Sequence, residues 1–135
     1  MWEHFHHQAD IGVRGMGATM EEAFVEAAYA LMAVVCNPQK VRSRMPVSIT
    51  AEAADRELLL ADWLNRIIYE SETNNMLFSR FEVIIQGDLL KGTAWGEPAD
   101  PRRHETAVAV KAATYQMLKV AHEDDRWIAQ CVVDV

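Results

Sequence analysis

Two stretches with helical periodicity, each opened by a capping residue, constrain the fold of this chain most. In the first, Thr19 and Glu22 match the capping box, whose hydroxyl and carboxylate satisfy free backbone amides at a helix start. Apolar residues then recur at helical spacing until Pro38, which disfavours the helical conformation in the residue before it. The second stretch follows Asp55 and covers about residues 56–71. Both patterns predict an amphipathic helix with one buried face.

Alternating apolar and polar residues before, between and after these helices are typical of strands. The expected strands cover residues 1–15, interrupted by glycines, then 47–52, 81–85, 89–95, 108–121 and 127–133. The sequence therefore predicts an α+β fold over the single domain 1–135. We expect two layers, a mainly antiparallel sheet with the two principal helices on one face.

The composition narrows the classes of function. A chain of 135 residues with half of them apolar can bury a real core. A formal charge of -7 argues against a protein that grips nucleic acid directly, and it suits docking onto a basic partner. No apolar run approaches the ~20 residues of a membrane span, and the first residues lack a signal-peptide pattern. A cytoplasmic location is expected. Cys36 and Cys131 lie in apolar runs and are expected to be buried thiols.

The strongest candidate for a site joins the two ends of the chain. Asp10 lies in the segment 7–13 and Asp134 in the closing segment 131–135, each beside residues typical of strands. Two aspartates held by strands offer hard oxygen ligands to a cation such as calcium or magnesium. Val135 adds a terminal carboxylate. The alternative is that both aspartates are turn or edge residues in solvent.

Lys111 and three histidines are further candidates. Lys111 is the one lysine in an otherwise apolar stretch. If it is buried, it needs a carboxylate partner or a function. The alternative is a lysine on an edge strand, where its charge prevents pairing with another chain. His4 and His6 would share one strand face and His7 the other. A metal-dependent hydrolase would need a bend that brings these histidines together with Asp10. Nucleophile–base, phosphate-loop, dinucleotide and helical zinc motifs do not occur.

Several segments together resemble the archease family. The run from His7 to Gly12 resembles the family's His-Thr-Ala-Asp-[Ile/Val]-Gly opening, with Gln8 where threonine is usual. A second departure is Gln116, where histidine is common. The resemblance spans nearly the whole chain in order. The other matching segments are Thr19 with 21–24, 59–65, 96–98 with Asp100 and His104, 110–115, and 127–135.

The resemblance implies a function that the residues alone do not. Archeases are small acidic cytoplasmic proteins that act on the RtcB-type RNA ligase, which uses GTP and manganese. Membership implies a non-catalytic activator that promotes ligase guanylylation and multiple turnover in tRNA splicing or RNA repair. It implies a divalent cation, assigned in the family as calcium with magnesium or manganese as alternatives, held by Asp10, Asp134 and Val135.

The resemblance also assigns Lys111 to activation of the partner, and His7 and Gln8 are candidates for a second shell around the ion. Direct binding to nucleic acid or to a membrane is not expected. Two other functions stay open at this point. One is the metal-dependent hydrolase, and the other is a general chaperone for tRNA-modifying enzymes such as a methyltransferase.

Overall fold

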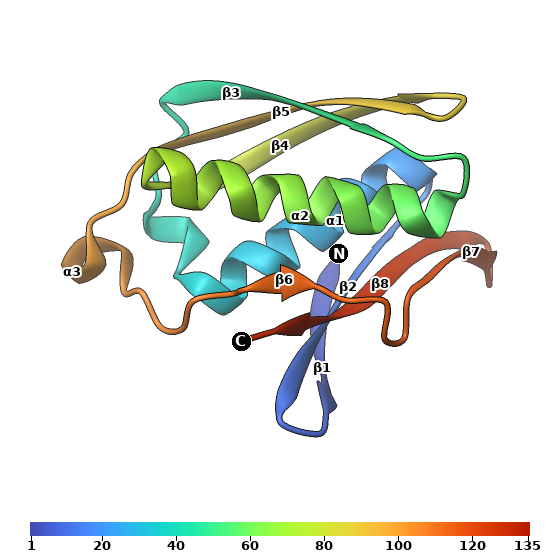
Figure 1. Cartoon of the computed structure of the whole chain (residues 1–135), viewed down its shortest axis with the longest axis horizontal. Helices are drawn as coiled ribbons and strands as arrows, with labels where there is room; N and C mark the ends of the chain where they lie inside the picture. Colours follow the sequence, from blue (N-terminus) through green and yellow to red (C-terminus); the bar gives the residue numbers. More distant parts are fainter.

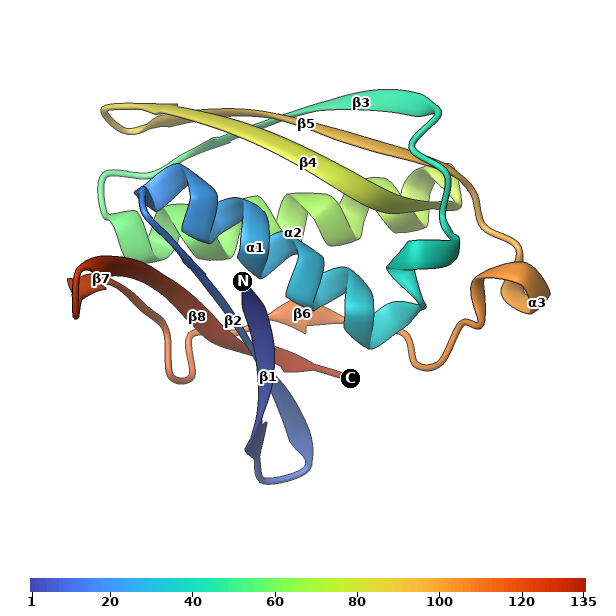
Figure 2. The ribbon, with the colours of Figure 1, turned by 180° about the vertical axis from the view of Figure 1, so that it is seen from behind.

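The computed structural model describes residues 1–135, and it stacks two antiparallel sheets on either side of a pair of helices (Figures 1 and 2). One sheet has the strand order β1-β2-β8-β6, with β7 also paired to β8, and the other has the order β3-β5-β4. The elements are β1 (Trp2–His7), β2 (Asp10–Gly17), α1 (Met20–Val35), the 3-10 helix η1 (Pro38–Lys40), β3 (Met45–Glu52), α2 (Arg56–Asn74), β4 (Met76–Gln86), β5 (Leu89–Pro98), α3 (Pro101–His104), β6 (Ala112–Ala113), β7 (Lys119–Glu123) and β8 (Arg126–Asp134).

The α+β class, the antiparallel pairing and the two principal helices are confirmed. Each sheet has helices on one face, as expected. The strands divide between two sheets, however, so that α1 and α2 contact strands on both sides of them and the molecule has a third layer. Local alternation cannot reveal this division, because it reports one buried face per strand and not which sheet the strand joins.

The predicted helix starts and stops are close to the observed ones. The Thr19 hydroxyl accepts from the Glu22 amide at 3.1 Å, and the Glu22 carboxylate accepts from the Ala18 amide at 2.8 Å. Helix α2 begins after Asp55 as predicted and continues to Asn74, beyond the expected end. It stops because Asn75 adopts the left-handed conformation, with φ of 50°.

Two strand predictions are wrong. The segment 1–15 is not one interrupted strand but a hairpin, which turns at Gln8 with φ of 55°. The long strand predicted for 108–121 is only β6 and part of β7, because Met117 has φ of 56° and breaks the run between them. Hydrogen bonds of Thr114 and Gln116 with Val132 of β8 hold this segment in an irregular path, although its residues favour an extended strand.

The core lies between the sheets and around the two helices. Its largest fully buried side chains include Trp63, Phe24 and Phe78, and the indole N–H of Trp63 donates to the carbonyl of Phe24 at 3.1 Å. Both cysteines are buried, as predicted, and burial raises the pKa of Cys36 to about 11 and that of Cys131 to about 12. None of the helices combines the length and the hydropathy needed to cross a membrane.

Gly15 sets the distance between β2 and α1. A Cβ atom at this position would lie 2.2 Å from the carbonyl oxygen of Ala23 and 2.2 Å from the backbone nitrogen of Ala27. Both atoms belong to the helix backbone, which cannot move aside as a flexible side chain would. The strand can approach the helix this closely only with glycine here.

We predict that Gly15→Ala lowers the free energy of unfolding by about 3 kcal/mol, since an inserted methyl must push α1 away from β2. Denaturant unfolding followed by circular dichroism measures the change. Gly87→Asn is the matched control, because Gly87 has φ of 59°, no heavy atom lies within 4 Å of its added Cβ, and asparagine tolerates this conformation. Equal stability of Gly15→Ala and the unmodified protein would contradict the close-approach account.

Candidate functional site

The pairing of β2 with β8 brings the two ends of the chain together. The register places Ile11 opposite Val133, so the next step along both strands places Asp10 opposite Asp134. Directly opposed residues of an antiparallel pair project from the same face, with Cβ atoms about 5 Å apart. The two aspartates chosen from the sequence are therefore neighbours on one face of this sheet.

The face that carries these aspartates is the outer one. Val13 and Cys131, an opposed pair at odd-numbered positions of the same two strands, are fully buried in the core against the helices. Because side chains alternate along a strand, the even-numbered Asp10 and Asp134 project away from the helices. Both residues are partly exposed, as a site that exchanges an ion with solvent requires.

His7 extends this arrangement into a row. The hairpin pairs His7 with Asp10, so the three residues His7, Asp10 and Asp134 follow one another across β1, β2 and β8 on the outer face. His7 Nδ1 is the only buried side-chain nitrogen or oxygen in the chain without a hydrogen-bond partner. Such an atom costs free energy unless it has a partner, and His7 is opposite Asp10 in the hairpin.

His4 points the other way. Its Nε2 lies 2.7 Å from the carbonyl oxygen of Ala30 in α1, which fixes the ring against the helix. His6 shares this parity along β1, so only His7 is on the face of Asp10. No group of three or more His, Cys, Asp or Glu side chains is arranged to hold a metal ion. The histidine cluster needed by a metal-dependent hydrolase is therefore not formed.

The C-terminal strand is held on both edges. The Lys111 amide donates to the Asp134 carbonyl at 2.8 Å, and the Thr114 amide and hydroxyl donate to the Val132 carbonyl at 2.9 and 2.7 Å. The Val132 amide in turn donates to the Gln116 carbonyl at 3.0 Å. The end of the chain is thus part of the sheet, and Val135 follows Asp134 at the same corner.

The same hydrogen bonds place Lys111 and Gln116. Lys111 is exposed, forms no ion pair and lies in the irregular stretch just before β6. It is therefore not a lysine buried in a strand, and its amide donates to the carbonyl of Asp134 at the end of β8. Gln116 contributes only its carbonyl oxygen to β8, so its departure from the family pattern leaves this contact intact.

Asn65 holds β6 in place, a role that no local sequence pattern predicts. Its side-chain amide donates to the Ala113 carbonyl at 3.1 Å, and its side-chain oxygen accepts from the Ala113 amide at 2.8 Å. This double contact anchors β6, and with it Lys111, to α2. The only signal in the sequence is an asparagine beside the buried face of a helix, which is too common to assign a partner.

A second polar cluster lies inside the protein, around Glu97 of β5. This carboxylate is 4 % exposed and accepts from the Arg42 amide at 2.7 Å. Arg103 forms an ion pair with it at 2.8 Å. The Asp100 amide donates to Nδ1 of His104, so the ring proton is on Nε2, which lies 2.9 Å from Glu97. The hydrogen bond from Arg103, with those from Arg42 and His104, lowers the pKa of Glu97 to about 2.

The chain has relatives among known proteins over its whole length. Residues 2–135 match the model of the archease protein family. The chain is 43% identical over 138 residues to protein archease of Methanopyrus kandleri, covering 99% of both chains. It is 40% identical over 139 residues to that of Pyrococcus furiosus, covering 99% of this chain and 98% of the relative.

Two solved structures share the fold. The solution structure of protein 1598 of Methanobacterium thermoautotrophicum has a TM-score of 0.82 and 36% identity, covering 99% of this chain and 98% of that one. The crystal structure of a Thermotoga maritima archease, described as a possible chaperone, has a TM-score of 0.65 and 20% identity, covering 97% and 94%. This chain belongs to the archease family.

We predict that Glu97→Gln lowers the free energy of unfolding near neutral pH by about 2 kcal/mol, because it removes the charged acceptor of the hydrogen bonds from Arg42, Arg103 and His104. The folded pKa is lower than the ordinary glutamate value of 4.5. The stability difference between the two proteins should therefore be constant above about pH 5 and shrink as the pH falls toward 2. Urea unfolding of both proteins across this range measures it, and a difference independent of pH would contradict the assignment.

Proposed function

We propose that this protein is a non-catalytic accessory factor that activates an RtcB-type RNA ligase in the cytoplasm. Membership of the archease family supports this class, and one solved relative is described as a possible chaperone, a role that requires a protein partner. The observation that carries the proposal is the register of β2 and β8, which puts Asp10 and Asp134 on one outer face. The protein's charge of -7 suits a protein partner better than RNA.

We propose that a divalent cation binds at this corner, although the His, Cys, Asp and Glu side chains alone form no group of three arranged to hold it. The donors would be the carboxylates of Asp10 and Asp134 and the terminal carboxylate of Val135, which are hard oxygen ligands of the kind that calcium, magnesium and manganese accept. The unpartnered Nδ1 of His7 offers a hydrogen-bonding group beside them. When bound, the ion would supply positive charge to bridge this acidic corner and a polar group of the ligase.

The proposed role in activation combines what the archease family implies with the positions of these residues. Asp10 and Asp134 dock at the mouth of the ligase active site, where they place a metal ion or reshape the ligase before its guanylylation. Lys111 is tied through its amide to the carbonyl of Asp134, so its exposed ammonium group acts within reach of the same corner. The ammonium group of Lys111 contacts a phosphate or a carboxylate of the ligase complex. No covalent chemistry on the RNA is assigned to this chain.

We predict that calcium binds to the unmodified protein and that Asp134→Asn weakens binding at least about tenfold, since it removes one anionic ligand. Isothermal titration calorimetry with calcium, and separately with manganese and magnesium, measures the affinity and the preferred ion. Asp88→Asn is the matched control, because Asp88 is an exposed residue of the turn between β4 and β5, on the other sheet from β8. Equal affinity in all three proteins would overturn the metal assignment.

We predict that the protein raises the number of turnovers of an RtcB-type ligase supplied with GTP and manganese. Lys111→Ala and Asp10→Asn should each reduce this stimulation by about tenfold or more, as expected when one charged contact to a partner is lost. Product per ligase molecule measures the effect. Lys119→Ala is the control for loss of a lysine elsewhere on the same sheet.

No stimulation by the unmodified protein would contradict the ligase role. In that case, mass spectrometry of proteins captured by the unmodified chain and not by Asp10→Asn would show whether the partner is another tRNA-processing enzyme.

A further inference from the structure

One edge of the three-stranded sheet is open. Strand β4 is at the end of the order β3-β5-β4 and pairs only with β5. Alternate residues of an antiparallel edge strand direct their amide and carbonyl groups away from the neighbouring strand. Residues 81–86 make no backbone–backbone hydrogen bond outside their pairing with β5. This half of β4 therefore presents a row of backbone donors and acceptors that no strand pairs.

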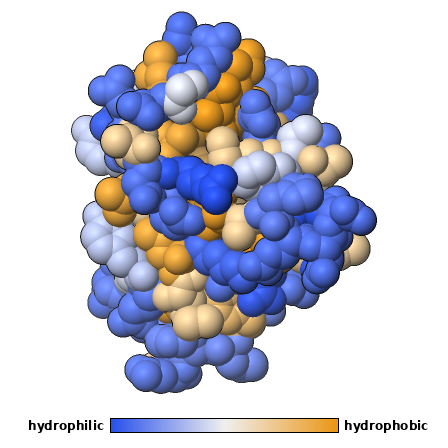
Figure 3. All heavy atoms as spheres, turned by 90° about the vertical axis from the view of Figure 1, so that its right-hand side faces the viewer, coloured by the Kyte–Doolittle hydropathy of each residue, from blue (hydrophilic) through white to orange (hydrophobic).

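The first half of β4, residues 76–80, is protected from pairing with another strand, and the second half, residues 81–86, is not. A bulge between Phe78 and Arg80 interrupts the register, and bulges are one way in which proteins block edge-to-edge pairing. Residues 81–86 contain neither lysine nor proline, and the side chain of Ile84 is 62% exposed. Figure 3 shows hydrophobic surface near the top of the end face, at the end of the molecule where β4 turns into β5.

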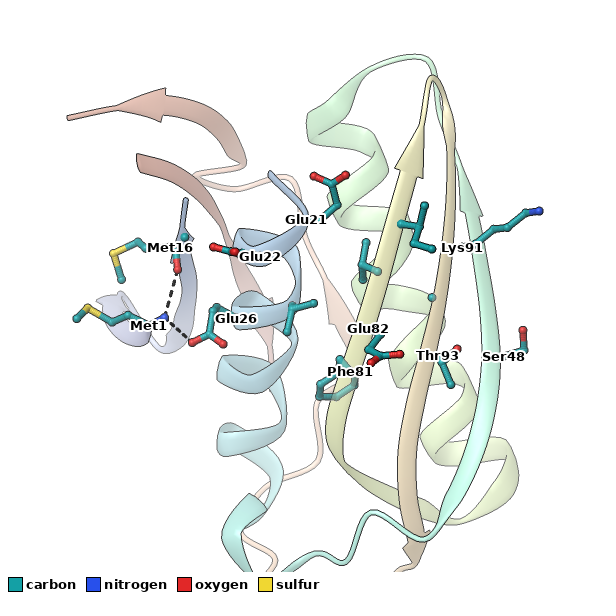
Figure 4. A pocket seen from close by; sticks show the side chains of 15 residues that line it. Met1, Met16, Glu21, Glu22, Glu26, Ser48, Phe81, Glu82, Lys91 and Thr93 are labelled. Atoms are coloured by element: carbon teal, nitrogen blue, oxygen red, sulfur yellow. Dashed lines mark hydrogen bonds and ion pairs between the residues drawn. The ribbon is translucent and has the colours of Figure 1, made fainter. Parts of the chain in front are cut away.

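A hollow of about 740 Å³ runs along this open half (Figure 4). The first half of α1 forms one wall, and the outer residues of β4 and β5 form the other, so the hollow wraps around the edge of β4. Its apolar surface includes Val25 of α1 and Phe81, Val83 and Ile84 of β4.

The hollow is acidic. Four carboxylates line it, and the single lysine that lines it, Lys91, extends away from α1 in Figure 4. The N-terminal ammonium of Met1 occupies one carboxylate, that of Glu26. Glu82 forms an ion pair with Arg80, and Glu22 accepts from the Ala18 amide. Glu21 is the carboxylate of the hollow that has neither an ion pair nor a hydrogen bond.

We propose that the open half of β4 is a second docking site, which binds an extended segment of a partner protein as an added fourth strand. Backbone hydrogen bonds to residues 81–86 would supply the pairing, as in other cases of strand addition. Charge complementarity selects a segment in which lysine or arginine alternates with valine or threonine. The basic side chains face Glu21 on the α1 side of the sheet, and the apolar ones lie against Ile84 on the opposite face. This site is on the other sheet from Asp10 and Asp134, and it does not depend on the ligase proposal.

The experiment uses the full chain and a soluble peptide of about eight residues that alternates lysine with valine and threonine, long enough to span residues 81–86. Fluorescence anisotropy measures its affinity, and amide hydrogen exchange locates it. We expect saturable binding that weakens as sodium chloride is raised, and slower exchange for outward-facing amides within residues 81–86. A peptide with glutamate in place of lysine is the charge control.

Two double variants test the location. Glu21→Lys with Glu82→Lys should weaken binding of the lysine peptide about tenfold or more, because the two reversals change the net charge of the groups lining the hollow from negative to positive. Glu52→Lys with Glu72→Lys makes the same change in net charge at exposed glutamates that do not line the hollow. This control pair should bind the peptide like the unmodified protein. Circular dichroism and thermal unfolding check that all variants fold.

Slower exchange in residues 81–86, with loss of affinity only in the first pair, supports the proposal. No binding, equal loss in both pairs, or protection elsewhere overturns it. Sedimentation of the free protein tests the rival occupant. A dimer whose contacts protect residues 81–86 would mean that a second copy occupies the edge, and this result also overturns the partner assignment.

Discussion

The antiparallel pairing of β2 with β8 is the contact on which the candidate site depends. It joins segments from opposite ends of the chain, and its register fixes which side chains share a face. A slip by one residue would turn Asp10 or Asp134 toward the helices and break the row. The register is specified strongly because Val13 and Cys131, on the inner face of the same strands, are fully buried. The buried core thus determines the geometry of the exposed acidic corner.

Polar contacts in and beside the core place the segments that have weak structural preferences. Asn65 holds the two-residue strand β6, and Thr114 ties the residues after it to β8. The Glu97 carboxylate holds two segments together, because one oxygen accepts from the Arg42 amide and the other pairs with the Arg103 guanidinium. Buried polar groups are costly unless they are paired, so each of these clusters strongly favours one arrangement of the chain. This is why an irregular stretch can present Lys111 at a fixed place.

The two sheets divide the surface into regions with different properties. The five-stranded sheet carries the acidic corner, where the chain ends are secured by hydrogen bonds on both sides of β8. The three-stranded sheet ends in β4, whose second half has an unpaired edge beside an acidic hollow. Both regions carry negative charge, in agreement with a net charge of -7.

The sequence by itself determined the elements whose signals are local. Local patterns predict these elements because each signal acts within a few residues. The signals are the caps at Thr19 and Asp55, the turn after Gln86 and the apolar spacing of both helices. The aspartates were also visible as candidates. Tertiary structure alone decided the split into two sheets, the irregular path before β7 and the partner of Asn65. These depend on contacts between residues far apart along the chain, such as Asn65 with Ala113, which a local pattern does not encode.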